Sequence, residues 1–94
     1  MQQLCVLGAT GSIGDSTFKV IRGSLGAYQV TALSAFSQID KCANLCAEFD
    51  VLYAWVPQDQ AQKLKTLLKA LGTDTQVLSD IQDLERLASL ECVD

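Results

Sequence analysis

The feature that most constrains the fold is a glycine-rich segment that directly follows a short apolar run. The run is Leu4-Cys5-Val6-Leu7, and the segment is Gly8-Ala9-Thr10-Gly11-Ser12-Ile13-Gly14, which leads into a helix-like stretch. A strand, a glycine turn and a helix in this order form the arrangement that holds a dinucleotide pyrophosphate. The sequence therefore predicts an α/β nucleotide-binding fold that starts with this strand.

Each glycine of the motif has its own expected role. Gly8 allows a tight turn off the strand, and Gly11 lets the backbone approach a phosphate because it has no Cβ. Gly14 lets the first helical turn lie near the sheet. A structural turn without a ligand is the alternative, whereas a P-loop is excluded because no Gly-Lys-Ser/Thr follows.

Four strand-then-helix units can be read along the whole chain. We expect strands at residues 3–7, 28–34, 51–56 and 75–78, and helices at 12–24 and 38–49, from Pro57 to Gly72, and from a Ser79-x-x-Gln82 capping box onward. The inner faces of the first two helices are predicted to carry Ile13, Thr17, Val20 and Ile21, and Ile39, Cys42, Ala43 and Cys46. Short connections between alternating strands and helices predict a Rossmann-like parallel sheet in a three-layer α/β/α arrangement.

The chain is expected to be part of a longer protein. Residues 1–94 form one domain, and residues 91–94 lie where a fifth strand is expected to begin. Four strands alone would leave apolar sheet edges and provide no wall for a substrate pocket. We therefore expect further domains beyond Asp94.

Composition narrows the class of partner. Hydrophobic residues make up 49% of the chain and charged residues 19%, which fits a packed core. The net charge of −4 argues against nucleic acid or an anionic membrane as the main partner. No leader or membrane segment is recognisable, so a cytoplasmic protein with reduced thiols is expected. Cys42 and Cys46 lie one helical turn apart, but without any His they are expected to be core thiols rather than metal ligands.

The end of the second strand bears on the choice of cofactor. An NAD site usually places an Asp or Glu there for the ribose 2′-hydroxyl, whereas this chain has Ser34-Ala35-Phe36-Ser37-Gln38. The absence of an acid favours NADPH, with Ser37 and Gln38 as donors to the 2′-phosphate. Lys41 would add a positive charge, and Asp40 would oppose it.

Two of these residues have alternative roles. Ser37 is equally compatible with a helix N-cap, in which Asp40 completes a capping box, and the two roles can coexist. Phe36 is expected either to pack against the adenine or to cover the sheet edge.

The residues also resemble a particular enzyme family. The run Leu7-Gly8-Ala9-Thr10-Gly11-Ser12-Ile13-Gly14-Asp15-Ser16-Thr17, continuing through residues 18–22, resembles the opening of 1-deoxy-D-xylulose 5-phosphate reductoisomerases. Later stretches at residues 28–33, 46–49 and 76–79 are also similar, so the resemblance covers essentially the whole chain. It identifies Thr10, Gly11, Ser12 and Ile13 as matches to the cofactor-phosphate turn of that family.

The resemblance implies an enzyme that needs NADPH and a divalent metal, Mg or Mn. Such an enzyme rearranges and reduces 1-deoxy-D-xylulose 5-phosphate to 2-C-methyl-D-erythritol 4-phosphate in non-mevalonate isoprenoid biosynthesis, usually as a homodimer. The metal-binding, substrate-binding and lid residues of the family would lie beyond Asp94. No catalytic or metal-binding residue is therefore assigned here, and this chain alone is expected to be inactive.

The sequence differs from the family pattern at one point, and two other classes of protein remain as alternatives. Many family members have Gly-Lys-Asn where this chain has Phe36-Ser37-Gln38, so the lysine that would meet the 2′-phosphate is absent. Semialdehyde dehydrogenases and extended short-chain dehydrogenases share the Gly-Ala-Thr-Gly opening. A non-catalytic nucleotide-sensing module is the other alternative.

Overall fold

Strands and helices alternate along the entire described chain. The computed structural model describes residues 2–24, 26–88 and 92–93. The elements are β1 (Gln2–Val6), α1 (Ser12–Gly23), β2 (Tyr28–Ser34), α2 (Ile39–Phe49), β3 (Tyr53–Trp55), α3 (Gln58–Leu71), β4 (Gln76–Leu78), α4 (Ile81–Ala88) and β5 (Cys92–Val93). The four predicted units are thus present, and a short fifth strand follows them.

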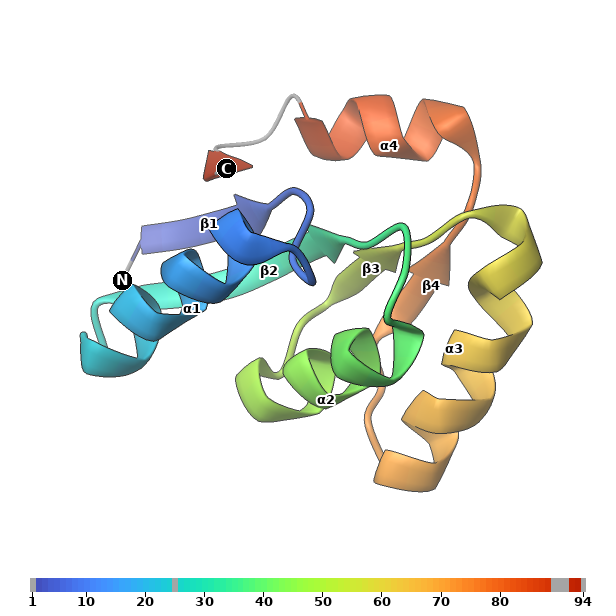
Figure 1. Cartoon of the computed structure of the whole chain (residues 1–94), viewed down its shortest axis with the longest axis horizontal. Coiled ribbons are helices and arrows are strands. Elements are labelled where there is room, and N and C mark those ends of the chain that lie inside the picture. Colours follow the sequence, from blue (N-terminus) through green and yellow to red (C-terminus); the bar gives the residue numbers. More distant parts are fainter. Residues whose placement is uncertain (1, 25, 89–91, 94) are drawn as a thin grey trace.

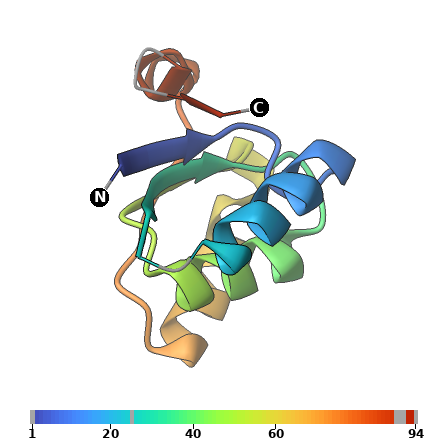
Figure 2. The same ribbon diagram turned by 90° about the vertical axis from the view of Figure 1, so that its left-hand side faces the viewer.

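The strands form one parallel sheet in the order β4-β3-β2-β1-β5. Each step from β1 to β4 moves to the next position in one direction, and α1, α2 and α3 lie together on one face (Figure 1). The step from β4 to β5 runs back to the far side of β1, and α4 lies on the opposite face (Figure 2). Right-handed crossovers require this change of face when the direction reverses. The predicted three-layer α/β/α arrangement is confirmed.

The larger core lies between the sheet and the first three helices. Phe18, Leu33 and Leu64 are among its fully buried side chains. The rings of Phe18 and Phe49 are 4.9 Å apart, which joins α1 to α2. All four residues predicted for the inner face of α2 are buried, as is Leu45.

The prediction for the inner face of α1 was partly wrong. Ile21 is buried as predicted, but Val20 is 62% exposed, and Phe18 is buried in its place. Gly14 lies directly against the backbone of Ala9, and this contact fixes the rotation of the helix about its axis. Residues on the same side of the helix as Gly14 therefore face the sheet. Phe18 is one turn beyond Gly14 and therefore enters the core.

A smaller cluster lies between the other face of the sheet and α4. Leu87 of α4 packs there with Cys5, Ala32 and Trp55. The indole Nε1–H of Trp55 donates to the carbonyl of Asp80 at 2.7 Å and so fixes the start of α4. That helix begins at Ile81, one residue later than the Ser79 capping box predicts. The Asp80 carbonyl accepts from the N–H groups of Asp83 and Leu84. The apolar spacing of the sequence also predicts Leu90 on this helix, and that residue lies outside the described residues.

No helix within the described ranges is long and apolar enough to cross a membrane.

Candidate functional site

The glycine turn lies at the carboxyl end of the central part of the sheet. It leaves β1, whose neighbours are β2 on one side and β5 on the other. The crossover direction reverses around β1, so this strand borders the topological switch point of the sheet. Ligands of open α/β sheets bind in the crevice outside the carboxyl ends of the strands at such a point. The fold therefore places the turn where a nucleotide would bind.

Hydrogen bonds from β2 hold the turn in place. Gly8 has a φ of +67°, a left-handed conformation that favours glycine. Its N–H donates to Oγ of Ser34 at 3.0 Å, and the N–H of Ala9 donates to the Ser34 carbonyl at 2.8 Å. The N–H of Gly11 then donates to the Gly8 carbonyl at 3.1 Å, which closes the turn.

Ser34 is a site residue that sequence reasoning missed. Its side chain is 1% exposed at the end of β2, and its hydroxyl accepts from a backbone group 26 residues away in the sequence. The available signal was a polar residue that follows the apolar pair Ala32-Leu33 at the end of the strand. Most buried polar groups have a hydrogen-bond partner, and the Gly8 N–H supplies one here.

Gly11 and Gly14 differ in what a side chain would meet. A Cβ on Gly14 would lie 2.3 Å from the Ala9 carbonyl oxygen, so only glycine fits between α1 and the turn. A Cβ on Gly11 would meet only the Gly8 carbonyl oxygen, at an ordinary 3.5 Å. The fold thus requires glycine at position 14, whereas the space above Gly11 is left open toward the exterior.

The N-terminus of α1 presents unpaired backbone donors at this open space. The helix starts after Gly11, which makes no side-chain cap, and its first intrahelical bond runs from the Asp15 N–H to the Gly11 carbonyl at 2.9 Å. The N–H groups of Ser12, Ile13 and Gly14 precede that bond and therefore have no partner within the helix. Together with the helix dipole, these donors favour a bound anion.

The segment after β2 is tied to the turn through Thr10. The hydroxyl of Thr10 donates to the Ser37 carbonyl at 3.1 Å, and Nε2 of Gln38 donates to the Thr10 carbonyl at 3.1 Å. Thr10 itself is 5% exposed, while Ser37 and Gln38 are exposed. The structure therefore brings together two groups of predicted site residues that lie far apart in the sequence.

The predicted capping box at the start of α2 is wrong. The N-cap is Gln38, with a φ of +52° and no side-chain cap bond, and the helix starts at Ile39. Ser37 lies one residue too early to cap the helix, because Gln38 occupies the N-cap position. The carbonyl of Ser37 accepts from Thr10, and a ligand role for its exposed side chain stays a prediction.

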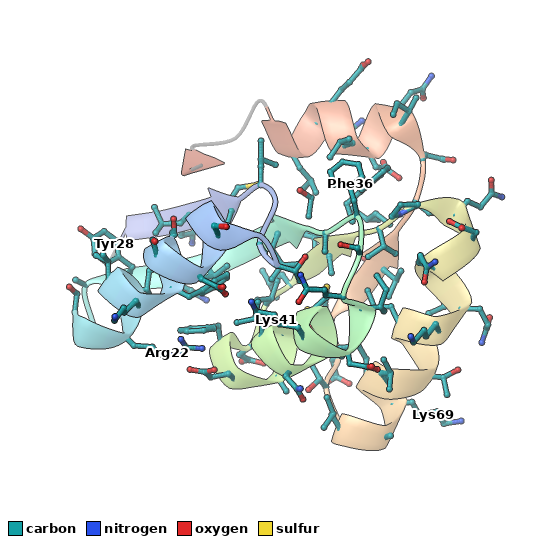
Figure 3. All side chains as sticks on the ribbon, in the orientation of Figure 1. Arg22, Tyr28, Phe36, Lys41 and Lys69 are labelled. Carbon is teal, nitrogen blue, oxygen red and sulfur yellow. The ribbon has the colours of Figure 1, made fainter. Side chains whose placement is uncertain are left out.

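A lysine from α2 reaches the same junction. Nζ of Lys41 lies 3.5 Å from the Thr10 carbonyl and forms an ion pair with a carboxylate oxygen of Asp15 on α1. Figure 3 shows Lys41 on the side of α2 that faces α1. A second pair links the two helices elsewhere: Nε of Arg22 lies 2.5 Å from Glu48. This contact lowers the pKa of Glu48 and raises that of Arg22.

Phe36 covers the end of the sheet on the side of α4. Its ring lies 5.3 Å from that of Trp55 and is 59% exposed. Trp55 belongs to β3, which lies between β2 and β4, so the ring packs at the end of interior strands and not along an edge strand. The exposed part of the ring leaves adenine stacking as a prediction.

The cysteines belong to the core. Cys5, Cys42 and Cys46 are all buried, as expected of core thiols. The hydrogen bond with Cys46, together with burial, raises the pKa of Cys42, so this thiol stays protonated. Within the part of the chain that the structure describes, no three His, Cys, Asp or Glu side chains group in a way that could hold a metal ion.

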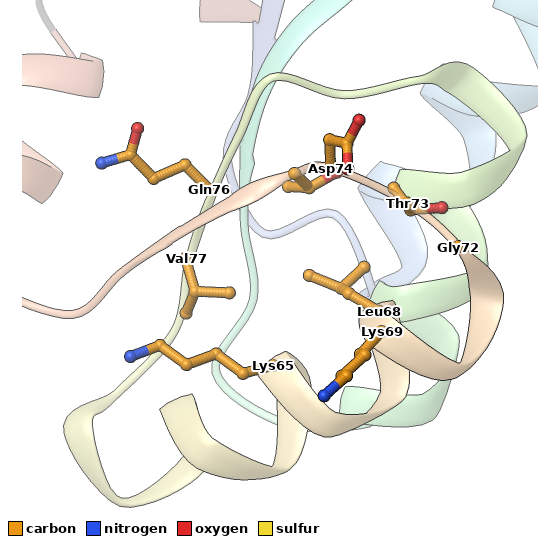
Figure 4. A pocket seen from close by; sticks show the side chains of 9 residues that line it. Lys65, Leu68, Lys69, Gly72, Thr73, Asp74, Gln76 and Val77 are labelled. Carbon is orange, nitrogen blue, oxygen red and sulfur yellow. The ribbon is translucent and has the colours of Figure 1, made fainter.

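Two hollows lie away from the turn. One, of 540 Å³, is lined by residues around the end of α3 and the start of β4, including Lys65, Lys69 and Asp74, and lies near the amino end of β4 (Figure 4). The other, of 380 Å³, lies between β4 and α4. Neither of these two hollows includes a residue of the glycine turn.

Comparison with known proteins identifies the family. A family model for 1-deoxy-D-xylulose 5-phosphate reductoisomerase matches residues 4–94. The chain belongs to the 1-deoxy-D-xylulose 5-phosphate reductoisomerase family. This assignment favours the resemblance seen in the sequence over the two dehydrogenase classes that share its opening.

Individual relatives agree with the assignment. Reductoisomerases from Psychromonas ingrahamii and Francisella tularensis subsp. novicida are 45% and 48% identical to this chain, over 95 and 92 residues. These matches cover 100% and 98% of this chain but only 24% and 23% of the relatives. The chain thus spans about a quarter of the length of the curated reductoisomerases that it matches.

Solved reductoisomerases share the fold. A structure described as DOX-P reductoisomerase with NADPH, fosmidomycin and magnesium has a TM-score of 0.89 and 40% identity, covering 100% of this chain and 23% of the other. The Zymomonas mobilis enzyme in complex with NADPH has a TM-score of 0.85 and 30% identity, covering 95% of this chain and 23% of the other. The Rossmann-like fold predicted from the sequence is confirmed.

Proposed function

We propose that this chain is the NADPH-binding domain of a 1-deoxy-D-xylulose 5-phosphate reductoisomerase. The complete enzyme would convert 1-deoxy-D-xylulose 5-phosphate to 2-C-methyl-D-erythritol 4-phosphate, with NADPH supplying the hydride for the reduction. The single observation that carries the proposal is the open space at Gly11. A Cβ there would fit the fold, yet glycine leaves the backbone donors of α1 accessible.

The turn and the start of α1 would hold the pyrophosphate. Gly8 shapes the turn, and Gly11 admits the phosphate close to the backbone. The N–H groups of Ser12 and Ile13 would donate to phosphate oxygens, and the Ser12 side chain is exposed at the same end of the helix. Thr10 is buried, so its contribution is to fix the turn against Ser37 rather than to meet the nucleotide with its hydroxyl.

Ser37 and Gln38 would hold the adenosine end of the cofactor. Both are exposed at the carboxyl side of β2, which is where a Rossmann-like fold places the adenosine ribose. The absence of an acid at this position supports NADPH over NADH. The nicotinamide would then project over the carboxyl ends of the strands toward the rest of the enzyme.

The remaining functions belong to the parts of a complete reductoisomerase that this chain does not contain. These include the divalent metal ion, Mg or Mn, the sugar phosphate and homodimer formation, which the family resemblance implies. We infer that the enzyme works in the cytoplasm, and the buried thiols of Cys42 and Cys46, which form no disulfide, support a reducing compartment. Nothing in the composition favours nucleic acid or membrane as a partner.

Calorimetric titration of the folded chain with NADPH and with NADH tests the proposal. We expect NADPH to bind more tightly, and Gly11→Val to weaken that binding about 100-fold or more, since a branched side chain would displace phosphate from at least two backbone donors. Gly23→Val is the matched control, because a Cβ at Gly23 meets nothing within 4 Å. Unchanged affinity in Gly11→Val, or binding of neither nucleotide by the folded chain, would overturn the proposal.

A further inference from the structure

The junction between the glycine turn and α2 contains one feature that the pyrophosphate site does not use. Lys41 extends from the first turn of α2 to the Thr10 carbonyl and to Asp15, which lies in the first turn of α1. The two charged side chains are 36% and 57% exposed. They therefore lie at the surface, where an incoming ligand can reach both.

This junction is also where the two proposed halves of the nucleotide site meet. Thr10 is bonded to Ser37 and to Gln38, and the same Thr10 carbonyl accepts from Nζ of Lys41. A phosphate beside Ser37 and Gln38 would consequently be close to the ammonium group of Lys41. The side chain of Lys41 is long and flexible, so its charge can turn toward such a phosphate without backbone movement.

The other donors at the junction supply little charge. Nε2 of Gln38 is neutral and is already bonded to the Thr10 carbonyl. Ser37 occupies the position at which the family resemblance places a lysine, so the usual cation is missing. On α1, Arg22 is paired with Glu48. Lys41 is thus the cation on α2 that already touches the turn.

We propose that Lys41 binds the 2′-phosphate of NADPH and that Asp15 competes with this phosphate for the lysine. In the free protein Lys41 is paired with Asp15, and in the complex the phosphate takes the place of the carboxylate. The exchange is favourable because a phosphate monoester carries more negative charge than a carboxylate and because an exposed ion pair contributes little to stability. This inference rests on the proposed function, since it assigns the specificity of the same site.

The two residues should act on NADPH in opposite directions. Removal of the positive charge of Lys41 removes a charge-assisted contact that only NADPH makes. Removal of the negative charge of Asp15 frees the lysine and eliminates repulsion of the phosphate. NADH lacks the 2′-phosphate, so its affinity should be insensitive to both changes.

The test is calorimetric titration of the folded chain with NADPH and with NADH, in the wild type and in Lys41→Gln, Asp15→Asn and Lys41→Arg. We expect Lys41→Gln to weaken NADPH about tenfold or more and Asp15→Asn to tighten it about threefold, with NADH unchanged. Lys41→Arg should retain the preference for NADPH. Lys19→Gln, which removes a charge from the exposed side of α1, is the control for net charge.

Each outcome decides the question. Equal weakening of NADPH and NADH by Lys41→Gln would mean that the lysine only supports the turn through Thr10, and it would overturn the inference. An unchanged ratio of the two affinities, or weaker NADPH binding in Asp15→Asn, would also overturn it. In those cases the wild type still binds NADPH, so the proposed function stands. If the folded wild-type chain binds neither nucleotide, the proposed function fails, and the inference fails with it.

Discussion

Among the substitutions that add one methyl group to a glycine of the motif, Gly14→Ala should lower the stability of the fold most. The added Cβ would lie 2.3 Å from the carbonyl oxygen of Ala9, 2.5 Å from its carbonyl carbon and 2.7 Å from its Cα. All three are backbone atoms of the turn, so no flexible side chain can move aside. To restore ordinary contact, α1 or the turn must shift by about 1 Å.

The magnitude follows from two opposing effects. Overpacking of a close backbone contact costs about 1–3 kcal/mol or more in the free energy of unfolding. The higher helix propensity of Ala returns at most about 1 kcal/mol. Because all three contacts are with backbone atoms, the cost should lie at the upper end of this range, about 3 kcal/mol. The net loss is then about 2 kcal/mol, which lowers the midpoint of thermal unfolding by roughly 8–16 °C for a domain of this size.

Urea and thermal unfolding followed by circular dichroism measure this loss. Gly23→Ala is the matched control, because it lies in the same helix and its Cβ would meet nothing within 4 Å. That variant should be neutral or slightly more stable. If Gly14→Ala proves as stable as Gly23→Ala, the close approach of α1 to the turn is not a constraint, and the reasoning is refuted. Because the shift would also displace the N-terminus of α1, Gly14→Ala should weaken NADPH binding even where the chain remains folded.

Two further predictions concern contacts between elements. Ser34→Ala removes the acceptor of the Gly8 N–H in a buried position and should cost about 1–3 kcal/mol of unfolding free energy in urea titrations; a loss no greater than that of an exposed Ser→Ala change would contradict this role. Glu48→Gln tests the pair with Arg22, whose contact lowers the pKa of Glu48. The stability from this pair is therefore present above the ordinary pKa of Glu, about 4.3, and is lost as the pH falls through the lowered value. The small difference in stability between wild type and Glu48→Gln should vanish in acid. A difference that grows in acid would contradict the lowered pKa of Glu48.

The alternation of elements was predictable because each unit is encoded locally. The strand Tyr28–Ser34 matches its predicted range, since most of its residues are apolar or β-branched and turn residues lie on both sides of it. The end of α3 also matches, because Gly72 adopts a left-handed conformation with a φ of +69°. Such signals need only a few neighbouring residues.

The failures arise where the deciding contact is distant in the sequence. Phe18 and Val20 are both apolar and lie on nearly opposite sides of the helix, about 200° apart, so hydropathy alone could not determine which side faces the sheet. The contact of Gly14 with Ala9 makes that choice. Likewise, the hydroxyl of Ser34 and the carbonyl of Ser37 have partners more than 25 residues away, which no local pattern reveals.

The position of β1 in the sheet has a consequence for the order of folding. The strands β1 to β4 join neighbours in the sequence, so their pairings close short loops. The pairing of Cys5 and Val6 with Cys92 and Val93 closes a loop of nearly the whole chain. Contacts of such long range form slowly and late. The wall of the crevice on the β5 side should therefore be completed last, after the glycine turn is already set on β2, so a nascent chain would present its anion-binding turn before it has a crevice to enclose the ligand.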